Sequence, residues 1–257
     1  MDNTKIKQLM LQLSQEAGEY LRNNFHTLKN MYAKDAGGVV TNVDLKLEEM
    51  LVNRIKKEFP DHGINVIDSK TLNPDSEFMW IIDALDGSSH FLRNIPIYAS
   101  SIAFQHKGKT IFGAVNHPET HELFFAEIGK GAQLNGIDIS VSDVSDLQQA
   151  YVYVELPEQK FLAQKEVVGD FHKHMQTLQN LIEKCKQVET FRIGTFGQCL
   201  VASGSFDAYV DLSGSSKELS QTASSLILRE AGGNVTDLDK SNDGFVRVMA
   251  TNGKLTI

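Results

Sequence analysis

The sequence of 257 residues has few of the features that mark secreted, membrane or nucleic-acid-binding proteins. It contains only two cysteines, Cys185 and Cys199, which are too few for a disulfide framework and form no CxxC metal pair. No apolar run approaches the roughly 18 residues that a bilayer crossing requires. The first residues, Met1 to Lys5, lack the basic-then-apolar order of a signal peptide. We therefore expect a cytoplasmic protein with reduced thiols.

An excess of basic charge is also missing, because the formal net charge is -8. A phosphate backbone would repel such a chain, so we expect neither nucleic acid nor membrane among its partners. The hydrophobic fraction of 41% and the charged fraction of 23% are those of an ordinary globular protein. Solubility alone accounts for the acidic excess, although part of it can also be concentrated to hold metal ions.

Apolar residues at helical spacing dominate the start of the chain. They predict an amphipathic helix within residues 1–30, with Thr4 as its N-cap. A second helix is expected over residues 44–59, and Pro60 ends it. After Pro60 the pattern changes to short apolar runs, which predict strands such as 79–82.

Strands and helices alternate from about residue 150, with helices expected over 171–185 and 218–230. No flexible linker or internal repeat interrupts the sequence. We therefore expect an α+β part over residues 1–146, which carries the functional site, and an α/β part over residues 147–257. The two parts are expected to pack as one compact unit.

Two carboxylates follow directly on the apolar run expected to form a buried strand. Asp83 and Asp86 are three residues apart, and Gly87, Ser88 and Ser89 provide turn residues and hydroxyls just beyond them. An all-oxygen site at the end of a strand suits a hard cation such as Mg²⁺. The start of a helix at Ser88 would also suit a phosphate group. The simpler alternative is that the two aspartates only cap that helix.

The segment WIIDALDGSSHF, residues 80–91, is similar to the W-I-[IV]-D-P-[IL]-D-G-T-[TS]-N-F signature of the inositol monophosphatase family. Further pieces resemble the family's other motifs in the same order along nearly the whole chain. They are VTNVD at 40–44, FPDH at 59–62, GKGA at 129–132 with NG at 135–136, LVASG at 200–204, DAY at 207–209 and REAGG at 229–233.

The resemblance implies a layered αβαβα sandwich, a mixture of α+β and α/β arrangements, and usually a homodimer. It also implies hydrolysis of a phosphomonoester with two or three Mg²⁺ ions, for which Mn²⁺ or Ca²⁺ can substitute. The implied substrate is inositol monophosphate or a related small phosphorylated alcohol or sugar.

The resemblance further implies roles for individual residues. Metal ligation is carried over to Asp83, Asp86 and the carbonyl group of Leu85. Ser88 takes the place of a threonine that, together with Asp44, orients the attacking water. Asp86 is also expected to hold a substrate hydroxyl, and Gly87, Ser88 and Ser89 are expected to donate to phosphate oxygens. Gly194, Thr195 and Asp211 lie where the family contacts the alcohol part of the substrate.

Two positions depart from the family's pattern. Ile67 stands where the family has a glutamate that ligates metal near the attacking water, and Asp68 replaces it only if the strand shifts by one residue. Ser220 stands where the family has a metal-ligating aspartate, and Glu218 is the nearest acid that could reach inward. Proline is also replaced by Ala84, with mainly conformational consequences.

Two hypotheses remain open at the level of sequence. The first is a Mg²⁺-dependent phosphoric monoester hydrolase with weakened metal binding, in which Asp68 or Glu218 partly replaces the missing ligands. The second is a catalytically impaired family member that serves as a binding or regulatory protein. The retained aspartates favour the first hypothesis, whereas Ile67 and Ser220 favour the second.

Overall fold

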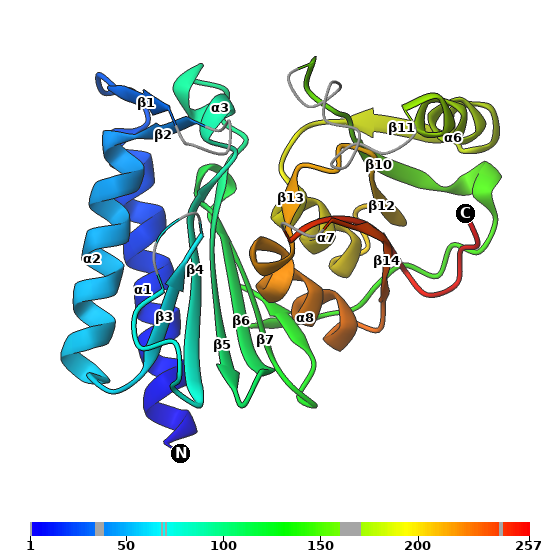
Figure 1. Ribbon diagram of the computed structural model, residues 1–257. Helices are drawn as coiled ribbons and strands as arrows, with labels where there is room; N and C mark the ends of the chain where they lie inside the picture. The colour runs from blue at the N-terminus through cyan, green and yellow to red at the C-terminus, as the bar shows by residue number, and fades with distance from the viewer. Residues whose placement is uncertain (1, 34–38, 68, 70, 160–170, 242–243) are drawn as a thin grey trace.

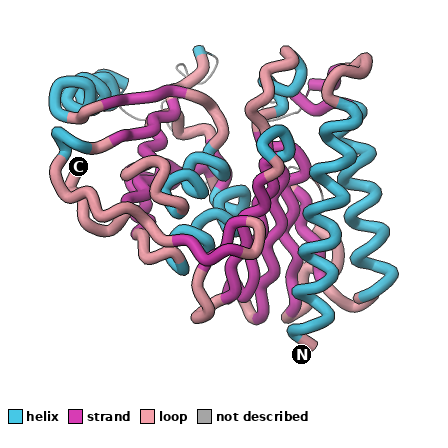
Figure 2. Tube along the Cα trace, turned by 180° about the vertical axis from the view of Figure 1, so that it is seen from behind, coloured by secondary structure: helices cyan, strands magenta, loops and turns pink. Residues whose placement is uncertain are grey.

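The structure is a computed structural model that describes residues 2–33, 39–67, 69, 71–159, 171–241 and 244–257. Helices and sheets alternate in layers across the molecule (Figure 1). Two helices cover a seven-stranded sheet, two more helices follow, and a six-stranded sheet with one flanking helix completes the order. The same order is seen from behind (Figure 2). The expected αβαβα sandwich is therefore confirmed.

The first layer consists of α1 (Asn3–Asn24) and α2 (Asn42–Glu58), joined through the short paired strands β1 (Met31–Ala33) and β2 (Val39–Thr41). The expected N-cap of the first helix was wrong by two residues. Asp2 is the cap, because its side chain accepts a hydrogen bond from the amide of Lys5 at 3.0 Å. An aspartate there also interacts favourably with the helix dipole.

The seven-stranded sheet has the strand order β3-β4-β5-β6-β7-β8-β9. Among the described strands of this sheet, only the pair β3–β4 is parallel, and the expected hairpin is the antiparallel pair β5–β6. The elements of this half are β3 (Gly63–Val66), β4 (Phe78–Asp86), α3 (Ser88–Leu92), β5 (Ala99–His106), β6 (Lys109–His117), η1 (Pro118–Thr120), β7 (Glu122–Glu127), β8 (Ala132–Leu134) and β9 (Ile137–Ile139).

The six-stranded sheet has the order β11-β10-β12-β15-β13, and β14 also pairs with β15. The expected helix over 218–230 is divided into a 3₁₀ turn and an α-helix. The elements of this half are η2 (Leu147–Gln149), β10 (Tyr151–Glu155), α6 (Phe171–Lys184), β11 (Gln187–Thr190), α7 (Gly194–Ala202), β12 (Ala208–Asp211), β13 (Ser216–Lys217), η3 (Glu218–Gln221), α8 (Thr222–Glu230), β14 (Asn234–Lys240) and β15 (Phe245–Thr251).

Three apolar clusters join the layers. One packs α1 and α2 against the seven-stranded sheet, where Trp80 and Phe104 are fully buried. The second fills the space between that sheet and α7 and α8, and it includes Val115 and Ile227. The third lies on the α6 side of the other sheet. Helices α7 and α8 are therefore the central layer, and they connect the site residues of both halves.

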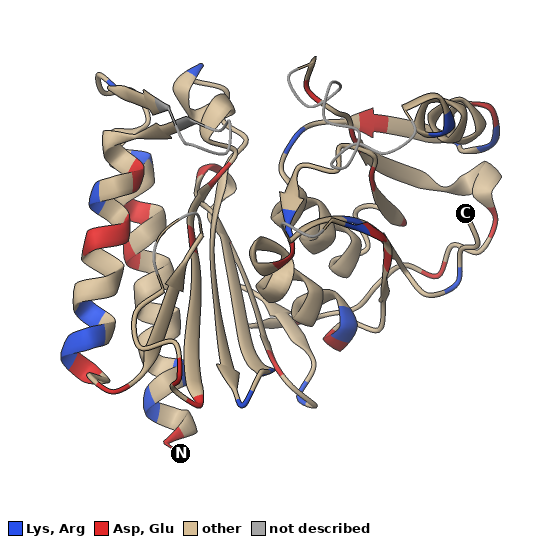
Figure 3. Cartoon of the chain, in the orientation of Figure 1, with Lys and Arg blue, Asp and Glu red and all other residues tan. Residues whose placement is uncertain are grey.

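Acidic and basic residues are interspersed along α1 and α2, so neither helix presents charges of a single sign (Figure 3). None of the helices in the described part of the chain combines the length and apolar character that a bilayer crossing requires.

Candidate functional site

The two signature aspartates lie at the carboxyl end of β4, in the centre of the molecule. Asp83 pairs with Ser101 of β5 and Asp86 pairs with Ala99, with an irregular register between them. The strand continues through Asp86, whereas the sequence predicted its end at Ile82. A bulge of this kind changes the direction of side chains near an active site. Both aspartates are partly buried.

The turn after β4 requires glycine. Gly87 has a φ angle of +83°, and an added Cβ atom would lie 2.9 Å from the carbonyl oxygen of Ile97. Left-handed backbone and this close approach together exclude a side chain. Gly87 is followed at once by α3, which begins at Ser88. The signature residues therefore form the compact turn that the sequence predicted.

Asp44 and Ser88, 44 residues apart in sequence, are brought together. The Ser88 hydroxyl lies within hydrogen-bonding distance of Asp44 Oδ1 at 3.2 Å and of the Leu85 carbonyl oxygen at 2.9 Å. Its single proton is shared between these two acceptors. Asp44 is 3% exposed and belongs to a capping box with Thr41, whose amide donates to Asp44 Oδ2 at 2.9 Å. Helix capping therefore fixes the carboxylate that meets Ser88.

Asp86 is bound by the first turn of α7. Its Oδ2 atom accepts hydrogen bonds from the amide of Thr195 at 3.1 Å and from the Thr195 hydroxyl at 2.5 Å. Burial raises the pKa of Asp86, whereas the Thr195 hydrogen bonds and the charge of Arg192 lower it. Two of the residues expected near the substrate, Asp86 and Thr195, thus contact each other directly.

A second pair of carboxylates lies at the carboxyl ends of two parallel strands. Glu155 of β10 and Asp211 of β12 are neighbours in the register, and both are buried. Tyr209 donates to Glu155 Oε2 at 2.8 Å, and Arg192 Nε lies 3.6 Å from Glu155 Oε1. Asp211 Oδ1 accepts from the amide and hydroxyl groups of Ser213 at 2.7 and 2.6 Å.

Burial raises the pKa of both carboxyl groups. For Glu155 the charge of Asp211 raises the pKa further, and Arg192 opposes the shift. For Asp211 the hydrogen bonds from Ser213 oppose it. Ligands of parallel-strand proteins usually bind at this edge of the sheet. The contact of Asp211 with the alcohol part of a substrate stays a prediction. The Asp211 side chain is 0% exposed, so a substrate could reach it only if neighbouring groups moved.

Neither of the two positions that depart from the family's pattern carries a charged side chain, and the structure shows where each of them lies. Ile67 is 9% exposed and belongs to the cluster between the sheet and α7 and α8. Ser220 lies in η3, which contacts β4. Glu218 does not turn inward: it is exposed and pairs with Lys240 at 2.5 Å. Asp68, the other expected replacement, lies outside the described residues.

Within the described part of the chain, the acidic ligands for the two or three Mg²⁺ ions that the family resemblance implies are not brought together. Among the described residues, no group of three or more His, Cys, Asp or Glu side chains converges. The carbonyl of Leu85 already accepts from Ser88, and Asp86 accepts twice from Thr195. Asp83 and Asp86 are the acids that the described part of the chain offers at the end of β4, and water and phosphate oxygens would have to complete the six ligands that Mg²⁺ requires.

Sequence reasoning missed Glu155, Arg192 and Gln221. Glu155 directly follows an apolar run, which is the same signal that identified Asp83. Gln221 is 4% exposed, and its Nε2 atom lies 2.7 Å from the Cβ that would be added to Gly194. Neither Gln221 nor Arg192 carries a local signal, since their role depends on contacts between distant elements.

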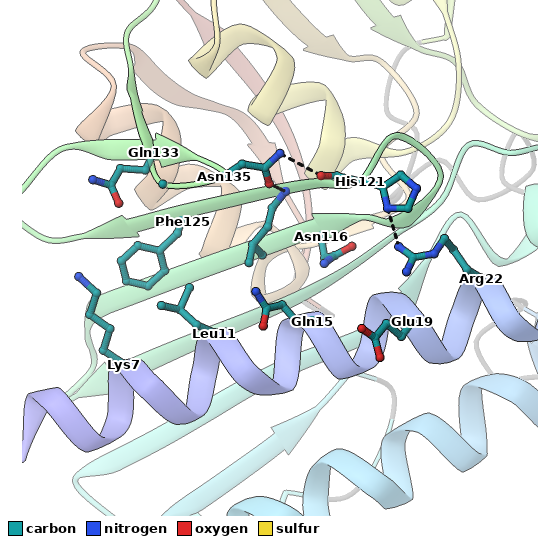
Figure 4. A pocket seen from close by; sticks show the side chains of 12 residues that line it. Lys7, Leu11, Gln15, Glu19, Arg22, Asn116, His121, Phe125, Gln133 and Asn135 are labelled. Atoms are coloured by element: carbon teal, nitrogen blue, oxygen red, sulfur yellow. Dashed lines mark hydrogen bonds between the residues drawn. The ribbon is translucent and has the colours of Figure 1, made fainter.

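A groove of about 630 Å³ lies elsewhere, between α1 and strands β6, β7 and β8 (Figure 4). Arg22 lies within 3.1 Å of the His121 ring at one end, and Asn135 donates to the His121 carbonyl at 2.9 Å. Among the described residues that line it, none was predicted for the functional site. The groove is therefore separate from the turn after β4.

Comparisons with known proteins agree with this architecture. The model of the inositol monophosphatase family matches residues 2–255. The Nus factor SuhB of Vibrio cholerae is 32% identical over 238 residues, which are 91% of this chain and 86% of that protein. The Escherichia coli K12 protein of the same name is 30% identical over 232 residues, covering 89% of this chain and 84% of that protein.

Solved structures give the same result. The extragenic suppressor protein suhB from Bartonella henselae superposes with a TM-score of 0.84 at 26% identity, over 97% of this chain and 95% of that chain. An IMPase from Thermotoga maritima has the same fold, with a TM-score of 0.81 at 24% identity, over 99% of this chain and 93% of that chain. Together with the bulged end of β4 and the Asp44–Ser88 pair, the match over nearly all residues shows that the chain belongs to the inositol monophosphatase family.

Proposed function

We propose that this chain binds a small phosphorylated alcohol or sugar at the turn after β4 and is catalytically impaired. The contrast between two parts of the site carries this proposal. The Gly87 turn and the Asp44–Ser88 hydrogen bond are present, whereas positions 67 and 220 carry isoleucine and serine. Glu218, the nearest described acid to Ser220 in sequence, pairs with Lys240 instead.

The names of the relatives are compatible with a role other than hydrolysis. The curated relatives described above are called Nus factor SuhB, a name that mentions no substrate. Loss of a ligand that positions a nucleophile removes several kcal/mol of transition-state stabilisation, whereas binding of the ground-state phosphate depends on other donors.

A second candidate function is Mg²⁺-dependent phosphomonoester hydrolysis, with Mn²⁺ or Ca²⁺ as substitutes and Asp68 as a replacement ligand. The Asp44–Ser88 hydrogen bond of 3.2 Å favours it, because in the family this pair orients the attacking water. The acidic pair Glu155 and Asp211 also lies next to Arg192, near the end of the site assigned to the alcohol.

Calorimetric titration with inositol 1-phosphate, run beside a phosphate-release assay in millimolar Mg²⁺ or Mn²⁺, tests both candidates. Binding without release above the Asp83→Asn background supports the impaired binding protein. Release well above that background supports the hydrolase instead. A panel of sugar and nucleotide phosphates extends the assay to other alcohols, and absence of both binding and release across the panel would refute both candidates.

Gly87→Ala is the variant that should abolish binding, since it strains the turn and meets the carbonyl oxygen of Ile97. Gly108→Ala is its matched control. Gly108 has a similar φ of +75°, but nothing lies within 4 Å of an added Cβ, and its turn lies beside the start of β4, at the opposite end of that strand from Gly87.

The predicted homodimer and the cytoplasmic location are kept as part of this proposal. Sedimentation velocity at micromolar concentration tests the dimer, and a single monomeric species would contradict it.

A further inference from the structure

Oxygen atoms assigned to metal by the family resemblance accept hydrogen bonds from this chain's own donors. Thr195, which is fully buried, donates to Asp86 through both its amide and its hydroxyl group. These bonds join β4 to the first turn of α7, across 109 residues of sequence. Hydrogen bonds to an ionised carboxylate are stronger than those between neutral groups.

The same helix also holds the element that contains Ser220. Gln198 of α7 donates from Nε2 to Gln221 Oε1 of η3, and Ser225 of α8 donates to Gln198 Oε1 at 3.0 Å. Gln198 and Gln221 are 0% and 4% exposed. Such buried amide networks are rigid when their members are satisfied.

Helix α7 therefore contacts both β4, which carries Asp86, and η3, which carries Ser220. If residue 220 were an aspartate, a cation could connect the same two elements. A metal at that position would neutralise two carboxylates and bind β4 to η3. Here η3 carries no carboxylate at that position, and the charge of Arg192 acts on Asp86. The mechanical connection between the two elements is therefore supplied by the protein itself.

We propose that α7, through Thr195 and Gln198, replaces a divalent cation as the connection between β4 and η3, so that the site is assembled without metal. The proposal concerns the unliganded protein. It rests on the site assignment and not on phosphate binding, so either proposal can fail while the other holds.

Thermal unfolding and calorimetric titration of the wild-type protein with Mg²⁺ alone provide the first test. In EDTA and in millimolar Mg²⁺ the melting temperature should differ by less than about 1 °C, because a ligand that binds weakly stabilises little. A rise of several degrees, or a titration with two saturating Mg²⁺ sites, would overturn the proposal. The double variant Ile67→Glu/Ser220→Asp, which restores both acids, serves as the control with an expected rise.

Two substitutions of Thr195 provide the second test. Thr195→Val has nearly the same shape but lacks the hydroxyl donor, and Thr195→Ser retains it. In EDTA the valine variant should melt about 5 °C below the serine variant. Mg²⁺ should recover part of that loss, because Asp86 Oδ2 then keeps only one of its two hydrogen bonds from residue 195, that from the backbone amide, and can also bind a cation.

An equal loss with and without Mg²⁺ would make Thr195 a packing residue and would overturn the proposal. So would equal melting temperatures for the two variants. If the valine variant does not fold, the wild-type titration with Mg²⁺ still decides the question. Gln198→Leu removes the hydrogen bond from α7 to Gln221 of η3, so it should also lower the melting temperature.

Discussion

At the scale of single residues, the loss of two acids is the main departure of this chain from the family's pattern. Ile67 is packed in an apolar cluster, and Ser220 is neutral. A carboxylate at position 67 would lie on the side of the sheet that faces α7, close to the end of β4. The difference from the family at these two positions is therefore one of charge.

The double variant Ile67→Glu/Ser220→Asp should gain phosphate release from inositol 1-phosphate in Mg²⁺. We expect a gain of about 100-fold or more over wild type, because metal and positioning effects each contribute several kcal/mol. The assay is initial-rate phosphate release, with the same double change in an Asp83→Asn background as control. No gain in the double variant would show that more than these two positions has been lost.

Glu218→Gln should leave Mg²⁺ affinity and phosphate release unchanged. The side chain is 52% exposed and pairs with Lys240, so its removal breaks only a surface ion pair. Calorimetric titration with Mg²⁺ measures the affinity, and Lys240→Gln is the matched control for loss of that pair. Weaker Mg²⁺ binding in Glu218→Gln alone would mean that this acid turns inward when metal is present.

The residues predictable from sequence are those with a local signal. Asp83, Asp86 and Gly87 follow an apolar run in a recognisable signature, and the structure places them at the end of β4. Glu155 follows the same rule and was missed because it is not in that signature. Contacts such as Thr195–Asp86 could not be predicted from local pattern, since they depend on how two sheets pack around one helix.

At the scale of elements, α7 is held against β6 by an aromatic pair. The ring of His117 is stacked on Phe196, with centroids 3.9 Å apart and planes inclined by 5°. Its Nδ1 atom forms a hydrogen bond with the Thr120 hydroxyl at 2.7 Å, and Nε2 is buried without a partner among the described atoms. This contact fixes the turn of α7 that carries Thr195.

Stability should fall as the pH is lowered, in part because of His117. Desolvation lowers the pKa of this ring to about 4, below its ordinary value of 6.5. The unfolded chain therefore binds a proton that the folded chain does not, so this contribution is complete above about pH 6.5 and is lost as the pH falls towards 4. The loss is of the order of 3 kcal/mol.

Urea unfolding at pH 7, 5.5 and 4.5 measures this dependence. His117→Phe keeps a flat ring against Phe196 but cannot bind a proton, so its stability should change less over this range. The exposed His26 provides the control variant His26→Phe. Parallel pH profiles for wild type and His117→Phe would contradict the assignment.

Element boundaries were predicted unevenly, for physical reasons. The second helix begins two residues early because Thr41 and Asp44 form a capping box. The expected helix over 218–230 begins as a 3₁₀ turn, and the buried Gln221 at the junction is bound to α7. Tertiary contacts of this kind override local helix preference.

At the scale of the whole molecule, the central helices hold both sheets together. Gly113 of β6 packs against α8, and an added Cβ would lie 2.7 Å from the Ala223 carbonyl oxygen. The layered order was predictable from the family resemblance, because alternating layers bury both faces of each sheet. The close contact between Gly113 and α8 could not be predicted, since nothing in the sequence around Gly113 indicates it.

Gly113→Ala should destabilise the protein by about 1 to 3 kcal/mol, because backbone must move to admit the methyl group. We expect a single unfolding transition at a lower temperature, as the two sheets share α7 and α8. Differential scanning calorimetry measures this. Gly108→Asn, in an open turn with φ of +75°, should be nearly neutral, and two separate transitions would show that the halves unfold independently.

The apolar burial of Ile67 has a consequence for how the family can change over time. A single substitution to glutamate would place an unpaired charge at a position that is 9% exposed, at a cost of several kcal/mol. A single aspartate at position 220 would meet no completed cation site. Under the proposed impaired function, each acid restored alone would therefore be unfavourable, and only the pair would compensate. A chain that carries neither acid would then be kept from regaining a metal site by its own stability.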